Sequence, residues 1–211
     1  MNHQLTKGHI TKSLLFFSLP MILGNLLQQF YNIADTFIVG QYLGSHALAA
    51  VGSSFTIMTF LTSIILGLCM GSGILFSMLF GAKEVDKMKT SFFVSFIGIA
   101  VLAVIIEILC LLCIHPILTF LNIPTDIYQQ TYDYLWIIFF GFFFTFLYNY
   151  FSCVLRALGN SRVPLIFLAI ATTVNIILDI FFIVSLNLGV GGAALATIIA
   201  QAMSGIGIMI Y

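Results

Sequence analysis

The feature that most constrains this chain is a set of apolar runs too long for a soluble fold. The stretch from Val163 to Leu188 is almost entirely Leu, Ile, Phe, Val and Ala, and one helix needs about 20 such residues to cross a bilayer. Apolar residues make up 61% of the chain and charged residues only 7%, whereas a soluble domain has about 25% charged residues. The chain is therefore predicted to be an integral membrane protein.

The apolar runs are continuous, which predicts helices. Strands of a membrane barrel would alternate polar and apolar residues instead. The seven Lys and Arg residues fall in three clusters, at residues 7–12, 83–89 and 156–162. Two spans fit after each cluster, and loops rich in Lys and Arg stay in the cytoplasm. We therefore expect a multi-pass protein of the plasma or inner membrane with a cytoplasmic N-terminus and helices over 12–41, 47–80, 91–114, 127–158, 163–187 and 192–211.

Polar residues inside these runs recur at steps of three and four, which puts them on single helix faces. Two of the stripes contain a carboxylate, Asp35 in the first helix and Asp179 in the fifth. An ionised carboxylate in hydrocarbon costs about 3 kcal/mol on insertion scales, so each should face a protein interior or a water-filled cavity. The stripes are Asn25, Gln28, Asn32 and Asp35; Thr145, Asn149, Ser152 and Arg156; Thr172, Asn175 and Asp179; and Thr197, Gln201 and Ser204.

The two carboxylates are expected at one depth. At about 1.5 Å per residue, Asp35 lies about 10 Å and Asp179 about 6 Å outward of the midpoints of their helices. A carboxylate in a poorly hydrated cavity can bind a proton or be neutralised by Na⁺, and ion-coupled transport needs such a change of charge state. The residues predicted to line this cavity are Asn25, Gln28, Tyr31, Asn32, Asn149 and Gln201.

Other residues carry weaker predictions. Pro20 should kink the first helix, because a proline inside a helix removes a hydrogen bond. Glu107 is the only charge of the third helix and has no polar neighbour at helical spacing, so a structural and a functional role both stay open. The four cysteines lie in apolar runs and are expected to pack as small hydrophobic residues.

Four motifs, in this order, resemble the multidrug and toxic compound extrusion (MATE) transporters, particularly bacterial members with acidic residues in helices 1 and 5. The resemblance spans the whole chain. The motifs are Pro20 with Gln28 and the run 34–40, the turn 155–164, Asn175 with Asp179, and the run 191–194 with Thr197.

The resemblance implies an all-α membrane protein whose six helices form the N-terminal lobe of a twelve-helix transporter. It implies that Asp35, Asn175, Asp179 and Thr197 form the proton or cation site, with Na⁺ at the two carboxylates as one possibility, and that Pro20 bends helix 1 between states. Members export organic cations and other drugs in exchange for H⁺ or Na⁺ and need no other cofactor. Because the second lobe supplies half of the substrate cleft, we expect this chain to be a fragment or to be completed by a second chain.

Other functions fit the residues less well. A lipid-linked oligosaccharide flippase or polysaccharide exporter of the same superfamily would need a cationic cavity, whereas Arg156 and Arg162 are expected at the inner surface. A channel would need symmetric polar rings. A membrane enzyme would need a catalytic motif such as HExxH, which the sequence lacks. No nucleic-acid partner is expected.

Overall fold

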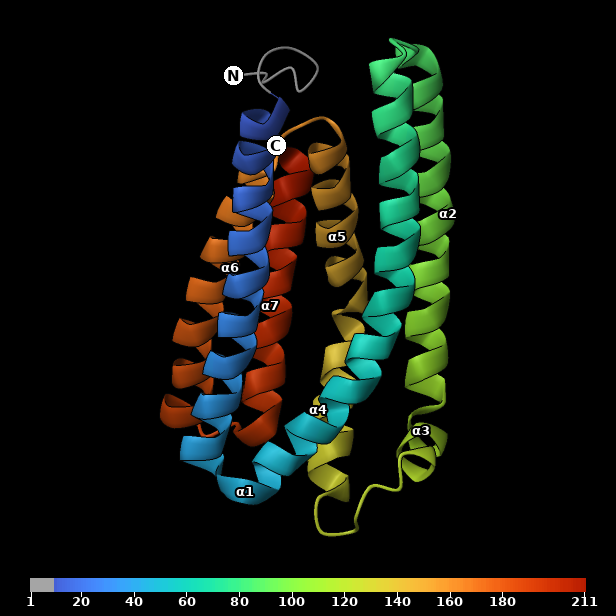
Figure 1. Ribbon diagram of the computed structural model, residues 1–211. Helices are drawn as coiled ribbons and strands as arrows, with labels where there is room; N and C mark the ends of the chain where they lie inside the picture. The colour runs from blue at the N-terminus through green and yellow to red at the C-terminus, as the bar shows by residue number, and fades with distance from the viewer. Residues whose placement is uncertain (1–9) are drawn as a thin grey trace.

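The first helical element turns back on itself. In the computed structural model, which describes residues 10–211, α1 (Ile10–Gly81) contains 72 residues. A straight helix of this length would measure about 110 Å, more than three times the hydrocarbon thickness of a bilayer. Gly44 interrupts it with φ 83° and ψ −174°, a conformation open essentially only to glycine. The element is therefore two antiparallel crossings joined at Gly44 (Figure 1).

The remaining elements run up and down beside α1 (Figure 1). Four helices of the described residues are long and apolar enough to span a membrane, and the bent pair α4–α5 makes a fifth span. Since α1 holds two crossings, the described chain makes six crossings, which confirms the predicted all-α fold. The elements after α1 are α2 (Val85–Leu112), α3 (Ile114–Phe120), α4 (Tyr128–Phe140), α5 (Phe142–Ala157), α6 (Arg162–Ile180), the π-helical turn η1 (Phe181–Ser185) and α7 (Gly189–Ile210).

The span made by α4 and α5 bends by 48°. The sequence analysis treated residues 127–158 as one uninterrupted helix, whereas the structure breaks it at Gly141. The Gly141 amide bonds to the Ile138 carbonyl at 2.9 Å, a tighter turn than in an α-helix. A Cβ built on Gly141 would lie 2.5 Å from Cγ1 of Ile198, so α7 packs directly against the break. The apolar pattern does not change there, and only this close contact shows why glycine is needed.

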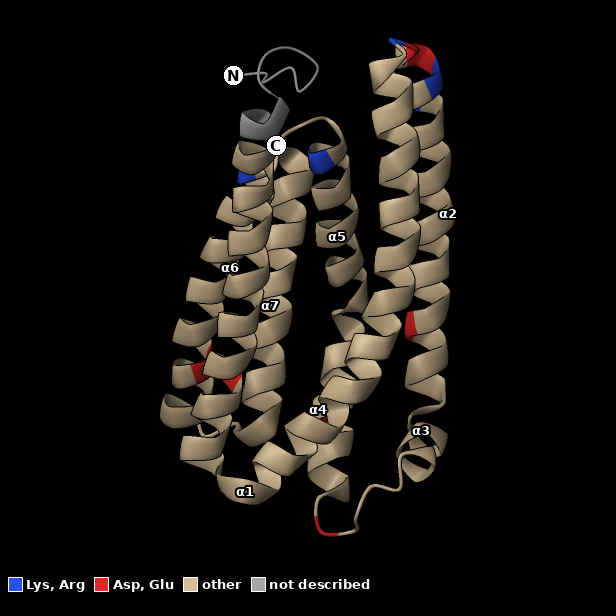
Figure 2. Cartoon of the chain, viewed as in Figure 1, with Lys and Arg blue, Asp and Glu red and all other residues tan. Residues whose placement is uncertain are grey.

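Lys and Arg residues gather at one end of the bundle (Figure 2). We call this the basic end, and it carries Lys83, Lys87, Lys89, Arg156 and Arg162. The predicted cluster members Lys7 and Lys12 lie outside the described side chains. Gly44 and the loop before α4 lie at the opposite end (Figure 1), where His46 Nδ1 is 3.4 Å from Asp126 Oδ2. One end thus concentrates positive charge, as the sequence analysis expected.

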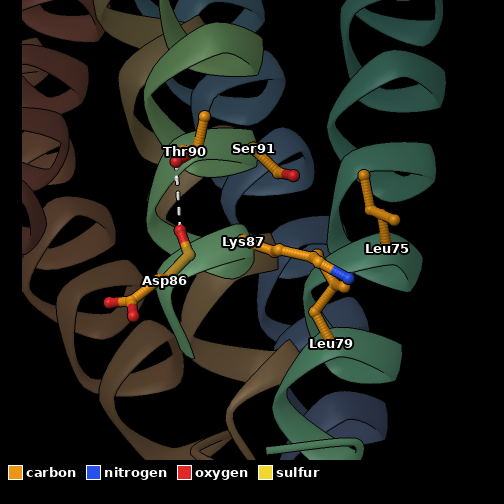
Figure 3. A pocket seen from close by; sticks show the side chains of 6 residues that line it. All are labelled: Leu75, Leu79, Asp86, Lys87, Thr90 and Ser91. Atoms are coloured by element: carbon orange, nitrogen blue, oxygen red, sulfur yellow. Dashed lines mark hydrogen bonds between the residues drawn. The ribbon is translucent and has the colours of Figure 1, made fainter. Parts of the chain in front are cut away.

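A groove of about 440 Å³ opens at the basic end between the last turns of α1 and the first turns of α2 (Figure 3). Its charged residue Lys87 pairs with Glu84 at 2.9 Å. Thr90 Oγ1 donates to the Asp86 carbonyl at 3.0 Å. The groove is therefore an open surface feature, and it lies apart from the buried polar residues described below.

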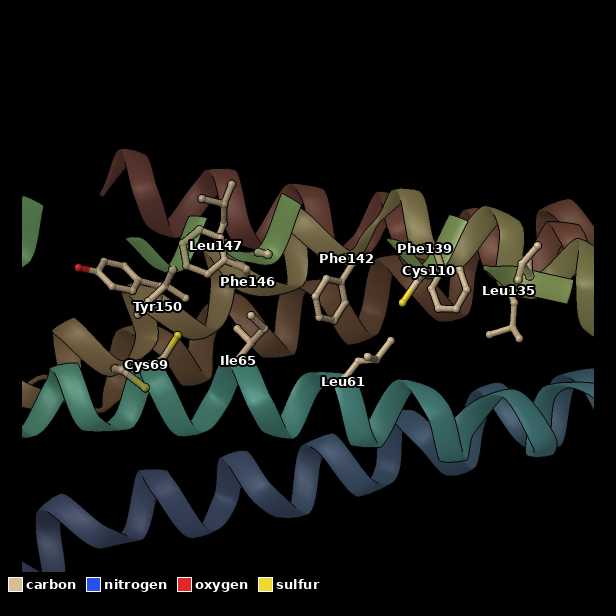
Figure 4. Close-up of a cluster of buried hydrophobic side chains, with 14 of the residues drawn as sticks. Leu61, Ile65, Cys69, Cys110, Leu135, Phe139, Phe142, Phe146, Leu147 and Tyr150 are labelled. Carbon is tan, nitrogen blue, oxygen red and sulfur yellow. The ribbon is translucent and has the colours of Figure 1, made fainter. Parts of the chain in front are cut away.

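The largest buried apolar cluster joins the second crossing of α1 to α2, α4 and α5. Figure 4 shows Leu61, Ile65 and Cys69 of α1 opposite aromatic side chains of α4 and α5. Cys69, Cys110 and Cys153 are buried and free, as expected for small hydrophobic residues, whereas Cys113, at the end of α2, is exposed. Among residues 10–211, no group of three or more His, Cys, Asp or Glu residues is placed to hold a metal ion.

The hydroxyl group of Tyr150 links α5 to α2 within this cluster. The side chain is fully buried, and its hydroxyl donates to the Phe92 carbonyl at 2.8 Å and lies 2.8 Å from Ser95 Oγ. We expect Tyr150→Phe to lower the free energy of unfolding by about 1 kcal/mol, the usual net value of such a bond. Thermal unfolding of the purified protein measures this, with the exposed Tyr42→Phe as the control. Equal melting temperatures for the two variants would contradict this role of the hydroxyl.

Candidate functional site

Two buried carboxyl groups meet between α1 and α6. Asp35 is 8% exposed and Asp179 is 0% exposed. The two carboxyl groups lie within hydrogen-bonding reach of each other. Figure 2 shows the acidic positions of these two helices close together, toward the end opposite the basic end. The helices that the sequence predicted to carry one buried acid each thus bring both acids to one place.

These carboxyl groups are short of hydrogen-bond donors. Oδ1 of Asp35 and both carboxyl oxygens of Asp179 accept no hydrogen bond from the residues that the structure describes. A buried oxygen without a donor is costly, and two carboxylates side by side also repel each other. A proton placed between them, or a cation bound by their oxygens, would remove both costs. The arrangement is therefore chemically suited to taking up positive charge.

Polar side chains from three helices surround the pair. Thr197 of α7 is the common acceptor: Tyr31 donates its hydroxyl to Thr197 Oγ1 at 3.3 Å, and Asn175 donates Nδ2 to the same atom at 3.5 Å. Both distances are longer than the usual ranges for such bonds, so each bond is weak in this conformation. The Asn175 side chain is fully buried, and its Oδ1 has no partner among the described residues. A further oxygen therefore lies free in the same buried cluster.

All of these residues lie at a similar depth. At about 1.5 Å per residue, Asp35 is about 13 Å from the turn at Gly44, and Asp179 is about 9 Å from the end of η1. By the same measure Thr197 is about 12 Å from the start of α7. The site thus lies inside the spans, nearer to the end of the bundle opposite the basic end.

Two glycines explain how the start of α7 comes close to η1 and α4 here. A Cβ on Gly192 would lie 3.1 Å from the Cβ of Phe182, and one on Gly191 would lie 3.2 Å from Cδ1 of Ile137. Two successive glycines therefore let the first turns of α7 contact both η1 and α4. The π-helical turn begins two residues after Asp179, and such turns are frequent at functional sites.

The structure adds Tyr134 of α4 to the site. Its side chain is 7% exposed and lies within electrostatic range of Asp35, Tyr31 and Asp179. The sequence analysis did not select Tyr134 as a site residue. Only the structure shows that Tyr134 shares a buried face of α4 with Thr131 and Ile138, whereas the neighbouring residues 133 and 136 are exposed.

Most residues predicted to line the cavity have other neighbours. Among the described residues, Tyr31 is the only one of them with a hydrogen bond to this site. Asn32 Nδ2 donates to Gln29 Oε1 at 3.3 Å, and Asn149 Nδ2 donates to the Thr145 carbonyl of its own helix at 2.8 Å. Asn25 is exposed, and Gln28 and Gln201 are half-buried. Their role as cavity-lining residues stays a prediction.

Pro20 lies inside α1 without a local break. Among the described residues of this helix, only Gly44 has non-helical dihedral angles. Pro20 was predicted to bend helix 1 differently in different transport states. The structure is a single conformation, so it does not test this difference. It stays a prediction.

The Thr197 hydroxyl can be tested without a transport assay. We expect Thr197→Val to destabilise the protein by about 1–3 kcal/mol, because the hydroxyl of Tyr31 and the amide of Asn175 lose their acceptor. Thr197→Ser keeps the acceptor and should cost less than the valine variant. Thr173→Val is the matched control, since Thr173 is exposed on α6 and bonds only to the Ala169 carbonyl. A melting temperature of Thr197→Val equal to that of the control would contradict this network.

Comparison with known proteins identifies the family. The MatE family model matches residues 20–181. The chain is 33% identical over 202 residues to "Probable multidrug resistance protein YpnP" of Bacillus subtilis, covering 96% of this chain and 45% of that protein. It is 32% identical to "Multidrug export protein MepA" of Staphylococcus haemolyticus, covering 97% of this chain and 45% of that protein. The chain thus spans about half the length of these relatives.

Solved structures agree with this match. The structure titled "Crystal structure of MATE in the bent conformation" superposes with a TM-score of 0.90 at 28% identity, over 97% of this chain and 46% of that chain. Six crossings and a helix order shared with half of a transporter confirm the predicted six-helix lobe. The family match covers both α1, with Asp35, and α6, with Asp179. The chain therefore belongs to the MATE family of multidrug and toxic compound extrusion transporters.

Proposed function

We propose that this chain is the ion-coupling lobe of a secondary transporter that exports organic cations and other drugs in exchange for H⁺ or Na⁺. The relatives named for multidrug resistance and multidrug export support the export of drugs. One observation carries the coupling: two buried carboxyl groups within reach of each other, whose free oxygens have no donor among the described residues.

The coupling follows from the charge of this pair. With no bound cation, two adjacent carboxylates repel each other in a poorly hydrated site. One proton, or one Na⁺ held by the carboxylates and Asn175 Oδ1, relieves this repulsion, since hard cations prefer oxygen ligands. An ion shifts a conformational equilibrium only by its differential affinity for the two states. In the proposed cycle, an ion therefore binds here from one side of the membrane and favours one conformation over the other.

The basic end indicates how the chain is oriented in the membrane. Because cytoplasmic loops are enriched in Lys and Arg, we place the basic end in the cytoplasm and the carboxyl pair nearer the outer surface. The coupling ion then enters from outside, as an inward ion gradient requires. A second six-helix lobe, on the same polypeptide or on another, completes the substrate cleft in this proposal.

The position of the arginines disfavours the flippase alternative. An anionic pyrophosphate substrate would need cationic side chains within the cavity, but Arg156 lies in the last turn of α5 and Arg162 at the start of α6, at the basic end. The only ionisable residues of the described site are acids and tyrosines. The local charge therefore suits a cationic cargo better than an anionic one.

The test uses the complete protein that contains this lobe, purified and reconstituted in liposomes with a fluorescent organic cation. We expect cation movement to follow an imposed pH gradient, an imposed Na⁺ gradient, or both, and to stop when the gradient is collapsed by an ionophore. Transport that ignores both gradients would overturn the antiport proposal. Liposomes without protein supply the background rate.

A further inference from the structure

The break between α4 and α5 leaves backbone groups that need partners. α5 begins at Phe142, and the first amides of a helix have no acceptor within it. Inside a membrane span, water does not replace that acceptor, so an orphan amide is costly. The amide of Phe143 donates instead to Oε2 of Glu107 on α2, at 3.2 Å. A side chain 36 residues away in the sequence therefore supplies the missing hydrogen-bond acceptor at the break.

Glu107 is well suited to this contact. It is the only charged residue between Lys89 and the end of α2, and its side chain is half-buried. The positive end of a helix dipole lies at the helix N-terminus, where a carboxylate is favourable. The contact thus accounts for an acid that has no polar neighbours on its own helix.

The break lies close to the site of the two carboxyl groups. Gly141 contacts Ile198, the residue after Thr197. Tyr134, two turns before the break on α4, is buried and lies within electrostatic range of Asp35 and Asp179. A shift of α4 at Gly141 would therefore move Tyr134 relative to the carboxyl pair and press on α7 next to Thr197.

We propose that Glu107 is a positioning residue of the transporter. By accepting the Phe143 amide, it holds the bend between α4 and α5 and so sets where Tyr134 lies beside the carboxyl pair. The inference rests on the proposed function for its transport consequence, whereas the state of the break can be measured without transport.

Three substitutions at one position separate the acceptor from the charge. Glu107→Gln keeps an acceptor oxygen at the same reach and removes the charge. Glu107→Asp keeps the charge but withdraws it by one methylene group, and Glu107→Leu removes both. Ile108→Leu, at an exposed neighbouring position of α2, is the matched control for a new leucine.

Hydrogen–deuterium exchange of the purified complete protein measures how well the amides at the break are protected. We expect exchange across residues 141–147 to rise about tenfold in Glu107→Leu, the factor that corresponds to losing one buried hydrogen bond. Glu107→Asp should show a clear rise as well. Glu107→Gln and the control should stay within about threefold of the parent, and exchange in α6 should not change.

Transport supplies the second measurement. We expect the ion concentration for half-maximal transport to shift about tenfold in Glu107→Leu and by less than about threefold in Glu107→Gln. Unchanged exchange at the break in Glu107→Leu and Glu107→Asp would overturn the inference, as would a glutamine variant as impaired as the leucine variant. If the leucine variant does not fold, the comparison of the aspartate and glutamine variants still decides. If the parent protein transports nothing, the proposed function fails while the exchange result still tests Glu107.

Discussion

Asp179→Asn is expected to abolish ion-coupled drug export and leave the protein folded in the membrane. Asparagine has nearly the shape of aspartate, but it cannot exchange a proton or present a full negative charge to Na⁺. Asp35 would then lack its charged partner, and the site would no longer differ in charge between the two conformations. We expect the gradient-driven rate to fall at least about a hundredfold, the factor set by about 2.8 kcal/mol of lost differential binding. Asp35→Asn should behave in the same way.

The measurement is gradient-driven uptake of a fluorescent organic cation by liposomes that contain the complete protein. Asp133→Asn is the matched control, because Asp133 is an exposed acid of α4 whose bond from Gln129 an asparagine can still accept. The control should transport at the parent rate. A rate near the parent value in Asp179→Asn, with equal amounts of folded protein, would remove the physical basis of the proposed coupling.

Gly205→Ala is expected to destabilise the protein, with one of the two largest effects on stability among the substitutions considered. A Cβ on Gly205 would lie 2.7 Å from the Phe144 carbonyl oxygen and 3.2 Å from the Cβ of Leu147. The clash is with backbone, so α5 and α7 must move apart, and overpacking of this kind costs about 1–3 kcal/mol. For a chain of this size we expect a melting temperature several degrees lower, at about 2–4 °C for each kcal/mol.

Gly67→Ala provides the matched control in thermal unfolding of the purified protein. It places the same methyl group inside α1, where the described residues leave open space within 4 Å. Alanine is a better helix former than glycine by about 1 kcal/mol, so the control should be neutral or stabilising. If Gly205→Ala unfolds at the temperature of Gly67→Ala, the close packing of α5 on α7 does not contribute to stability.

Much of this architecture could be predicted from the sequence, because its causes are local. Apolar runs of membrane length predict helices wherever they occur, and the clusters of Lys and Arg predict how often the chain turns back. The break at Gly44 lies between the predicted first two helices, and the six crossings match the prediction. Helical spacing also placed Asp35 and Asp179 on interior faces, where the structure buries both.

Other features depend on contacts between distant residues. Gly141 lies in an apolar run like its neighbours, and only Ile198 of α7 and the Glu107 carboxyl group on α2 account for the bend there. Nothing in the sequence around Tyr134 indicates whether its hydroxyl faces the carboxyl pair or the membrane surface. In contrast, Asn149 was predicted to line a cavity because it lies in a stripe of polar residues, but its side-chain amide donates to a carbonyl of its own helix.

The sequence by itself determined that this chain crosses a membrane as helices, how many times it does so, and which faces carry acids. These properties follow from the hydrophobicity and the 3.6-residue period of single segments. Only the tertiary structure decided that Asp35 and Asp179 come within reach of each other, that Tyr134 and Thr197 join them, and that Glu107 closes the break at Phe143. The reason is physical, since the rotation and tilt of each helix are set by packing against its neighbours.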